Sequence, residues 1–167
     1  MFESPPFESH CMRKLPFFVA VCAGLIATSP EAAPRGPEAD VLAMINAERV
    51  QHGCKPLRVE ARLSEAAKRQ SRGMAERHYF SHNAPDGSTP GRRVKDTGYV
   101  YQMVGENIEI NSDDPEAVVS TWMNSPGHRQ NILMCAFKET GIAMAWSEGD
   151  GGAYWTQVFA MPLNLGK

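Results

Sequence analysis

The spacing of apolar residues along the chain predicts a mixture of helices and strands. Apolar positions three and four apart, each group behind a residue that can cap a helix, indicate amphipathic helices at 40–52, 64–78 and 114–122. Gly98 should stop a shorter helix at 92–97, and a further helix start is expected at Ser125, where Pro126 suits the first turn. We expect three or four helices in the fold, with Asp40, Ser64, Asp114 and Ser125 as the candidate caps.

Three stretches alternate between apolar and polar residues, as strands do. They cover 99–110, 139–146 and 154–161, and the last two are joined by the turn sequence SEGDGG at 147–152, which is typical of a hairpin. The predicted class is therefore α+β with a small, largely antiparallel sheet.

Length and charge limit the possible functions. At 167 residues the chain is long enough for one domain with a sizeable core, and its formal net charge is −2. So small a charge supplies no long-range attraction to nucleic acid or to an anionic membrane surface, so neither is expected as a partner.

The N-terminus has the pattern of an export signal. Arg13 and Lys14 precede an apolar run at 15–27, which at 13 residues is too short to span a bilayer. Because a basic pair normally lies near the start of a signal, we expect translation to begin at Met12. An N-terminal helix kept in the fold is the alternative. The expected division is 1–37 for extension, signal and Pro-rich spacer, 38–163 for the domain and 164–167 for a tail, in an exported protein that is periplasmic or extracellular and not integral to the membrane.

The four cysteines divide into two pairs. Cys11 and Cys22 lie in the segment expected to be removed, which leaves Cys54 and Cys135 as an even pair in an oxidising compartment. A disulfide closing so long a loop would stabilise the fold by about 4 kcal/mol on the chain-entropy estimate. The alternative is a pair of buried free thiols.

His82, Glu106 and His128 are the candidate site residues, since each falls at a loop or at the end of an element rather than within an apolar face. Two imidazoles and a carboxylate form a ligand set that suits zinc with positions left open for water. The alternative is that hydrogen bonds among the three residues tie loops together without a metal.

Four motifs in a fixed order resemble the bacterial branch of the CAP superfamily, the cysteine-rich secretory, antigen 5 and pathogenesis-related proteins, also called the SCP domain. They are FSH at 80–82, GENI at 105–108, WMNSPGHRQNIL at 122–133 and YWTQVF at 154–159. The resemblance runs from about Asp40 to Met161 and implies a three-layer α-β-α sandwich. It also implies a surface cleft of two His and two acidic residues, which in several members binds a divalent cation. Ser125 stands where many eukaryotic relatives have Glu, so any zinc should be held weakly.

Four further residues are expected to support this cleft. Asn107 and Asn131 should bond backbone groups at turns, Arg129 should pair with Glu106 or another carboxylate, and Ser125 should begin the helix that carries His128. Six aromatic residues are expected in the core by default, with lining of the cleft as the alternative for Tyr79 and Trp155. The six are Tyr79, Phe80, Trp122, Tyr154, Trp155 and Phe159.

Three functions fit this pattern. The leading hypothesis is a non-enzymatic binding module for a lipid, a cell-envelope component or a host molecule. The second is a metal-dependent hydrolase of peptides or envelope material, with Glu106 as the base acting on a metal-activated water. Ser81 and Ser125 lie near the histidines, but the chain has no nucleophile-elbow motif. The third is a protein-interaction scaffold in which the three residues only brace the fold.

Overall fold

The computed structural model describes residues 36–149 and 151–163. The expected signal, the start at Met12 and the cysteines Cys11 and Cys22 lie outside the described residues. Those expectations, and the division of the chain into segments, therefore stay predictions.

Five helices are described, more than the three or four expected. Pro occupies the first turn of four of them, where its missing N–H needs no partner. Among the described residues, none of the helices is long and apolar enough to cross a membrane. Their bounds are α1 (Pro37–Gln51), α2 (Ala61–Arg77), α3 (Pro90–Asp96), α4 (Pro115–Asn124) and α5 (Pro126–Leu133).

The helix caps agree with the sequence in part. Asp114 caps α4 as predicted, its carboxylate accepting the N–H of Glu116 at 3.0 Å. The caps predicted at Asp40 and Ser64 are wrong, because each helix begins three residues before the expected cap. Pro37 already supplies a first turn for α1. The carboxylate of Glu60 caps α2, so Ser64 lies inside that helix and its hydroxyl donates to the Glu60 carbonyl at 3.3 Å.

The sheet has four described strands in the order β1-β3-β4-β2. Only β1 and β3 run parallel, so the sheet is largely antiparallel as expected. Two-residue β1 was not predicted, since its strand character comes only from pairing with Glu139 and Thr140. Strand β2 lies at one edge of the sheet. The bounds are β1 (Arg58–Val59), β2 (Tyr101–Ile110), β3 (Glu139–Trp146) and β4 (Ala153–Pro162).

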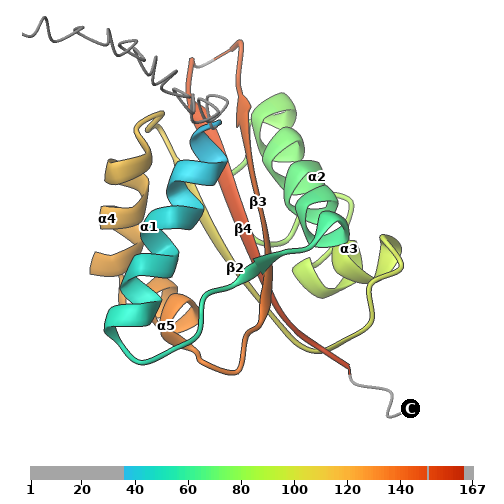
Figure 1. Cartoon of the computed structure of the whole chain (residues 1–167). Coiled ribbons are helices and arrows are strands. Elements are labelled where there is room, and N and C mark those ends of the chain that lie inside the picture. The colour runs from blue at the N-terminus through green and yellow to red at the C-terminus, as the bar shows by residue number, and fades with distance from the viewer. Residues whose placement is uncertain (1–35, 150, 164–167) are drawn as a thin grey trace, which may run out of the picture. The chain divides into compact units, whose positions relative to one another are not determined.

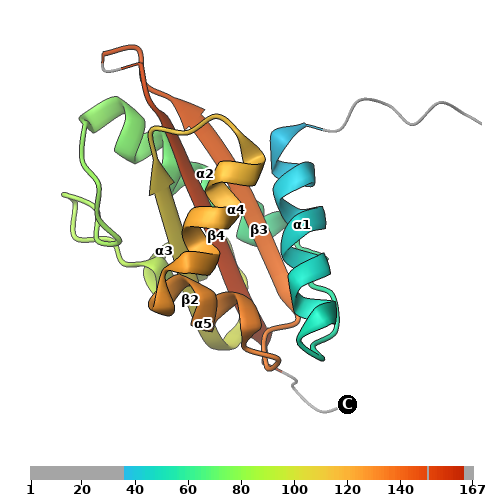
Figure 2. The same ribbon diagram turned by 90° about the vertical axis from the view of Figure 1, so that its left-hand side faces the viewer.

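Helices cover both faces of the sheet. Figure 1 shows α2 and α3 on one side and α1, α4 and α5 on the other, and Figure 2 shows this second layer face on. Trp122 and Trp155 are fully buried under the α1–α4–α5 layer. On the other face α2 approaches β3 so closely that a Cβ at Gly141 would collide with the backbone N of Ser64. The predicted three-layer sandwich is confirmed.

The loop after α5 is fixed by a disulfide and a buried arginine. Cys54 and Cys135 are bonded as predicted, with their Cα atoms 5.0 Å apart and 81 residues apart in sequence. The guanidinium of Arg49, which is 0% exposed, donates to the carbonyls of Ile132 at 2.5 Å and Phe137 at 3.0 Å. Burial lowers the pKa of Arg49 below its ordinary value. Because the guanidinium donates to several carbonyls, it supplies hydrogen bonds to backbone acceptors at the end of α5 and in the loop after it.

We predict that Arg49→Met lowers the free energy of unfolding by roughly 2–4 kcal/mol, since it leaves buried carbonyls without a donor. Urea denaturation followed by circular dichroism measures this. Arg69→Met is the control, because the Arg69 side chain is 47% exposed and pairs with Glu65 on the same helix. An Arg49 variant as stable as the control would contradict the role of the buried guanidinium.

Candidate functional site

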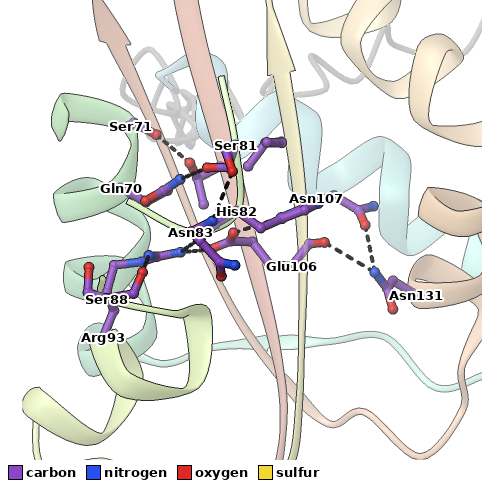
Figure 3. Close-up of polar contacts among 12 residues, drawn as sticks. Gln70, Ser71, Ser81, His82, Asn83, Ser88, Arg93, Glu106, Asn107 and Asn131 are labelled. Carbon is purple, nitrogen blue, oxygen red and sulfur yellow. Dashed lines mark hydrogen bonds and ion pairs between the residues drawn. The ribbon is translucent and has the colours of Figure 1, made fainter. Parts of the chain in front are cut away.

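The buried carboxylate of Glu106 is the centre of the candidate site. Its Oε1 lies 2.9 Å from Nδ1 of His82, and its Oε2 accepts a hydrogen bond of 2.8 Å from Nη2 of Arg93. Only 2% of the Glu106 side chain is exposed. Figure 3 shows the imidazole and the guanidinium converging on this carboxylate. Both oxygens are thus engaged, as a buried charge requires.

Arg93 also holds the loop that carries His82. The guanidinium donates to the carbonyl of Ser88 through Nη1 and to the carbonyl of His82 through Nη2, both at 3.0 Å. Its Nε has no partner among the described residues. Since Arg93 lies on α3 and Glu106 on β2, this side chain fastens the helix and the loop to the edge strand.

Gln70 fixes the other end of the same loop. This buried α2 side chain donates from Nε2 to the carbonyl of Ser81 at 2.7 Å and accepts from the hydroxyl of Tyr79 at 3.2 Å. The loop backbone is therefore bound on both sides of His82. The imidazole itself remains 48% exposed, so it is held in place and still accessible.

The partners of Glu106 determine which nitrogen of His82 carries the proton. A carboxylate paired with a guanidinium only accepts hydrogen bonds, so Nδ1 of His82 must be the donor. In the neutral ring the opposite nitrogen, Nε2, is then an acceptor. The site thus offers an oriented hydrogen-bond acceptor on an exposed side chain.

Successive residues of a strand point to opposite faces, so Asn107 faces away from the Glu106 carboxylate. Its amide donates to the carbonyl of His128 at 3.1 Å, and Asn131 donates to Oδ1 of Asn107 at 2.9 Å and to the carbonyl of Glu106 at 3.2 Å. A Cβ at Gly105 would lie 3.0 Å from Oδ1 of Asn131, so glycine lets α5 approach β2. The Gly105-Glu106-Asn107 motif therefore contacts the helix layers on both faces of the sheet, α3 through Glu106 and α5 through Gly105 and Asn107.

His128 lies on α5, near enough to His82 for the two rings to interact electrostatically. Its Nδ1 is buried without a hydrogen-bond partner among the described residues. Burial, and secondly the nearby His82, lower the pKa of His128 below its ordinary value. The imidazole is therefore kept neutral beside the His82 ring.

Two of the expected supporting residues lie apart from this network. Arg129 is exposed and its Nη2 lies 3.2 Å from Nε2 of His52, at the end of α1. It does not pair with Glu106, whose partner is Arg93. Ser125 begins α5 as predicted, but its side chain makes no capping hydrogen bond. Asn107 and Asn131, by contrast, lie at the centre of the contacts between α5 and β2.

Sequence reasoning missed Arg93 and Gln70. Arg93 follows Arg92 in a short helix, and nothing in the sequence separates the buried arginine from its exposed neighbour. Gln70 did carry a signal, because it interrupts the Ala-rich apolar face predicted for α2. Phe80 was expected in the core but is 49% exposed.

The side chains as they stand do not form a complete metal site. The described residues contain no group of three or more His, Cys, Asp or Glu side chains placed to hold a metal ion. In addition, Arg93 is paired with one oxygen of Glu106 and His82 lies against the other, so this carboxylate is already engaged. Zinc binding stays a prediction, and an ion here would be held by two nitrogens unless Glu106 left Arg93.

The histidines also lack a nucleophile. Among the described residues, neither His82 nor His128 has a Ser, Thr or Cys side chain as a hydrogen-bond partner. The hydroxyl of Ser81 instead accepts the N–H of Asn83 at 3.2 Å. The arrangement is suited to hydrogen-bonding a ligand rather than to activating a hydroxyl for attack.

The fold and the site define a three-layer α-β-α domain in which a buried carboxylate on the edge strand β2 orients an exposed imidazole. Residues 42–159 match the model of the Cysteine-rich secretory protein family, CAP. The chain belongs to this family, which confirms the resemblance carried by the motifs.

Bacterial proteins are among its relatives. The chain is 38% identical over 132 residues to the uncharacterized protein YkwD of Bacillus subtilis, covering 79% of this chain and 50% of YkwD. It is similar to the solved structure of an extracellular protein containing a SCP domain from Bacillus anthracis, with a TM-score of 0.66, 29% identity and 74% and 40% of the two chains covered. An outer surface protein of Borrelia burgdorferi shares the fold at a TM-score of 0.70 and 18% identity, with 75% and 92% covered.

The chain spans only part of its curated relatives. It covers 50% of YkwD and 34% of the uncharacterized membrane protein YlbC of Bacillus subtilis. Their remaining segments have no counterpart in this match, so the activity of a whole relative does not transfer to this chain.

We predict strong coupling between Arg93 and Glu106 in a double-mutant cycle. Arg93→Met and Glu106→Gln should each destabilise the fold by about 3–5 kcal/mol, because each leaves a buried partner uncompensated. The double variant should lose little more than either single variant. Arg92→Met is the matched control: its side chain is 69% exposed and pairs with Asp96, so it should cost under about 1 kcal/mol. Additive losses would contradict a direct pairing.

Proposed function

We propose that this chain is an exported CAP-domain binding module without enzymatic activity, which recognises its ligand on the surface around His82. The observation that carries this proposal is the engagement of both Glu106 oxygens by His82 and Arg93. A group acting as a general base must lie within hydrogen-bond reach of the substrate proton, whereas the Glu106 side chain is only 2% exposed. The Glu106 carboxylate instead orients an imidazole, as a ligand-binding surface needs.

The surface around His82 favours a polar ligand with some apolar faces. Phe80 is 49% exposed, and Ser81, His82 and Asn83 next to it are exposed as well. An exposed ring beside hydrogen-bonding side chains can stack on the apolar face of a sugar while the polar groups bond its hydroxyls. We therefore propose a glycan of the cell envelope as the ligand class. The Bacillus anthracis relative is described as extracellular, which supports a location where such glycans are reached.

Zinc is a secondary part of the proposal. A structural neighbour with 13% identity and a TM-score of 0.55, NaASP2, is described with Zn²⁺. In this chain we propose that zinc, if bound, is held weakly by His82 and His128, since Glu106 is paired with Arg93. Strong zinc binding with release of substrate fragments would instead support the hydrolase.

A groove between α1 and α4 favours a neutral lipid as a second candidate ligand. Two cavities of about 400 Å³ each lie along these helices and share Met44 and Glu116 in their linings. Val119 and Met123 add apolar surface to one of them. Because several carboxylates also line the groove, a neutral lipid suits it better than a fatty-acid anion.

We predict that soluble fragments of envelope glycan bind the purified protein, as measured by isothermal titration calorimetry. Phe80→Ser and His82→Ala should each weaken binding by about tenfold or more, because each removes a central contact. Matched controls are Val100→Ser and His52→Ala, which change an exposed apolar residue and an exposed histidine outside 80–83. The controls should bind as the unchanged protein does.

Two other results would replace this proposal. New reducing ends released from the glycan, and lost in Glu106→Gln protein that circular dichroism shows to be folded, would establish the hydrolase. Unaltered binding in both Phe80→Ser and His82→Ala would move recognition away from His82. If a neutral lipid then bound, and Met44→Asp abolished that binding, the α1–α4 groove would be the site.

A further inference from the structure

A separate cavity of about 420 Å³ lies where the C-terminal end of α2 meets the turn between β3 and β4. Figure 1 shows these two segments side by side. The volume is in the range that accommodates small molecules. None of its lining residues belongs to the site around Glu106. The lining consists of Ala75, Glu76, His78, Trp146, Glu148 and Gly149.

The cavity contains the exposed tryptophan of the chain. Trp146 is 53% exposed, whereas the other two tryptophans, Trp122 and Trp155, are 0% exposed. A large aromatic face left open to water beside a cavity is a surface that a ligand can cover with a gain in free energy.

The charges in this lining are negative. Glu76 and Glu148 are both exposed, and no Lys or Arg is among the lining residues. Arg77 follows Glu76 but is engaged elsewhere, 5.4 Å from the ring centre of Tyr79 and 4.0 Å from a carboxylate oxygen of Asp86. An indole face with two carboxylates, and with no Lys or Arg in the lining, provides the surroundings that an ammonium ion prefers.

Contacts of His78 hold the two sides of the cavity together, one formed by the end of α2 and the other by the turn between β3 and β4. His78 ends α2 in the left-handed conformation, with φ of 51°, and its Nδ1 lies 3.4 Å from Oγ of the buried Ser147. Gly149 packs on the same ring, since a Cβ there would lie 2.6 Å from Cε1 of His78. The helix end is thereby held against the turn, which keeps Glu76 and Glu148 around the same space.

We propose that this cavity binds a small organic ammonium ion, with the cation against the indole of Trp146 and between the carboxylates of Glu76 and Glu148. The feature that the ligand must have is a positively charged ammonium group. Its source is either a primary amine, as in lysine, or a quaternary amine, as in choline. This site is independent of glycan binding at His82.

Tryptophan fluorescence tests the proposal directly, because Trp146 is the tryptophan that water and iodide can reach. The probes are choline and Nα-acetyl-lysine methylamide, each titrated to about 10 mM. We expect a saturable change in emission and protection of the fluorescence from iodide quenching. The neutral carbon analogue of choline, 3,3-dimethylbutan-1-ol, should give neither. Tighter binding of choline or of the lysine derivative identifies the source of the ammonium group.

Matched variants locate the binding. Glu76→Gln combined with Glu148→Gln should weaken binding by about tenfold, since both negative charges are lost. Both residues are exposed, so folding is not at risk, and circular dichroism checks this. Glu65→Gln combined with Asp113→Asn removes two exposed carboxylates elsewhere and should change nothing. No saturable response to either ammonium ion, equal binding of the neutral analogue, or full binding in the Glu76 and Glu148 variant would overturn the proposal.

Discussion

The ion pair between Glu106 and Arg93 is the interaction on which the site depends. Both side chains are buried, so each charge is stable there only because the other is present. The pair fastens α3 to the edge strand β2, and the remaining carboxylate oxygen fixes the imidazole of His82. A carboxylate that the sequence indicates as a candidate metal ligand therefore acts as the support for an exposed histidine.

The edge position of β2 lets one short motif organise two layers. Glu106 faces the side of α2 and α3, and Asn107 faces α5, where it reaches the backbone of His128 and the amide of Asn131. Gly105 provides the room for that contact. His82 lies close enough to His128 to help burial lower the pKa of His128, which favours the neutral form of that ring. The disulfide and Arg49 hold the loop that follows α5, so the helix carrying His128 is anchored at both ends.

Much of this fold follows from the sequence, and the departures have physical causes. The β3 bounds and the Asp114 cap were predicted because alternation and capping are local signals. The caps expected at Asp40 and Ser64 were wrong because Pro37 and Glu60 begin those helices earlier. The motifs indicated His82, Glu106 and His128. They did not indicate that the guanidinium of Arg93 would lie beside the Glu106 carboxylate, where a metal ion was expected. Arg92 and Arg93 are equivalent in sequence, and only the packing of α3 on β2 distinguishes them.

The central claim is that Glu106 is an acceptor held by Arg93 and that it orients His82. Long-range ¹H–¹⁵N NMR of the imidazole rings at neutral pH tests it most directly. The predicted result is that His82 in its neutral form carries its proton on Nδ1, with Nε2 free, while His128 stays neutral below the ordinary histidine pKa of about 6.5. A His82 ring protonated on Nε2 alone would mean that Glu106 does not accept from it, and would contradict the account.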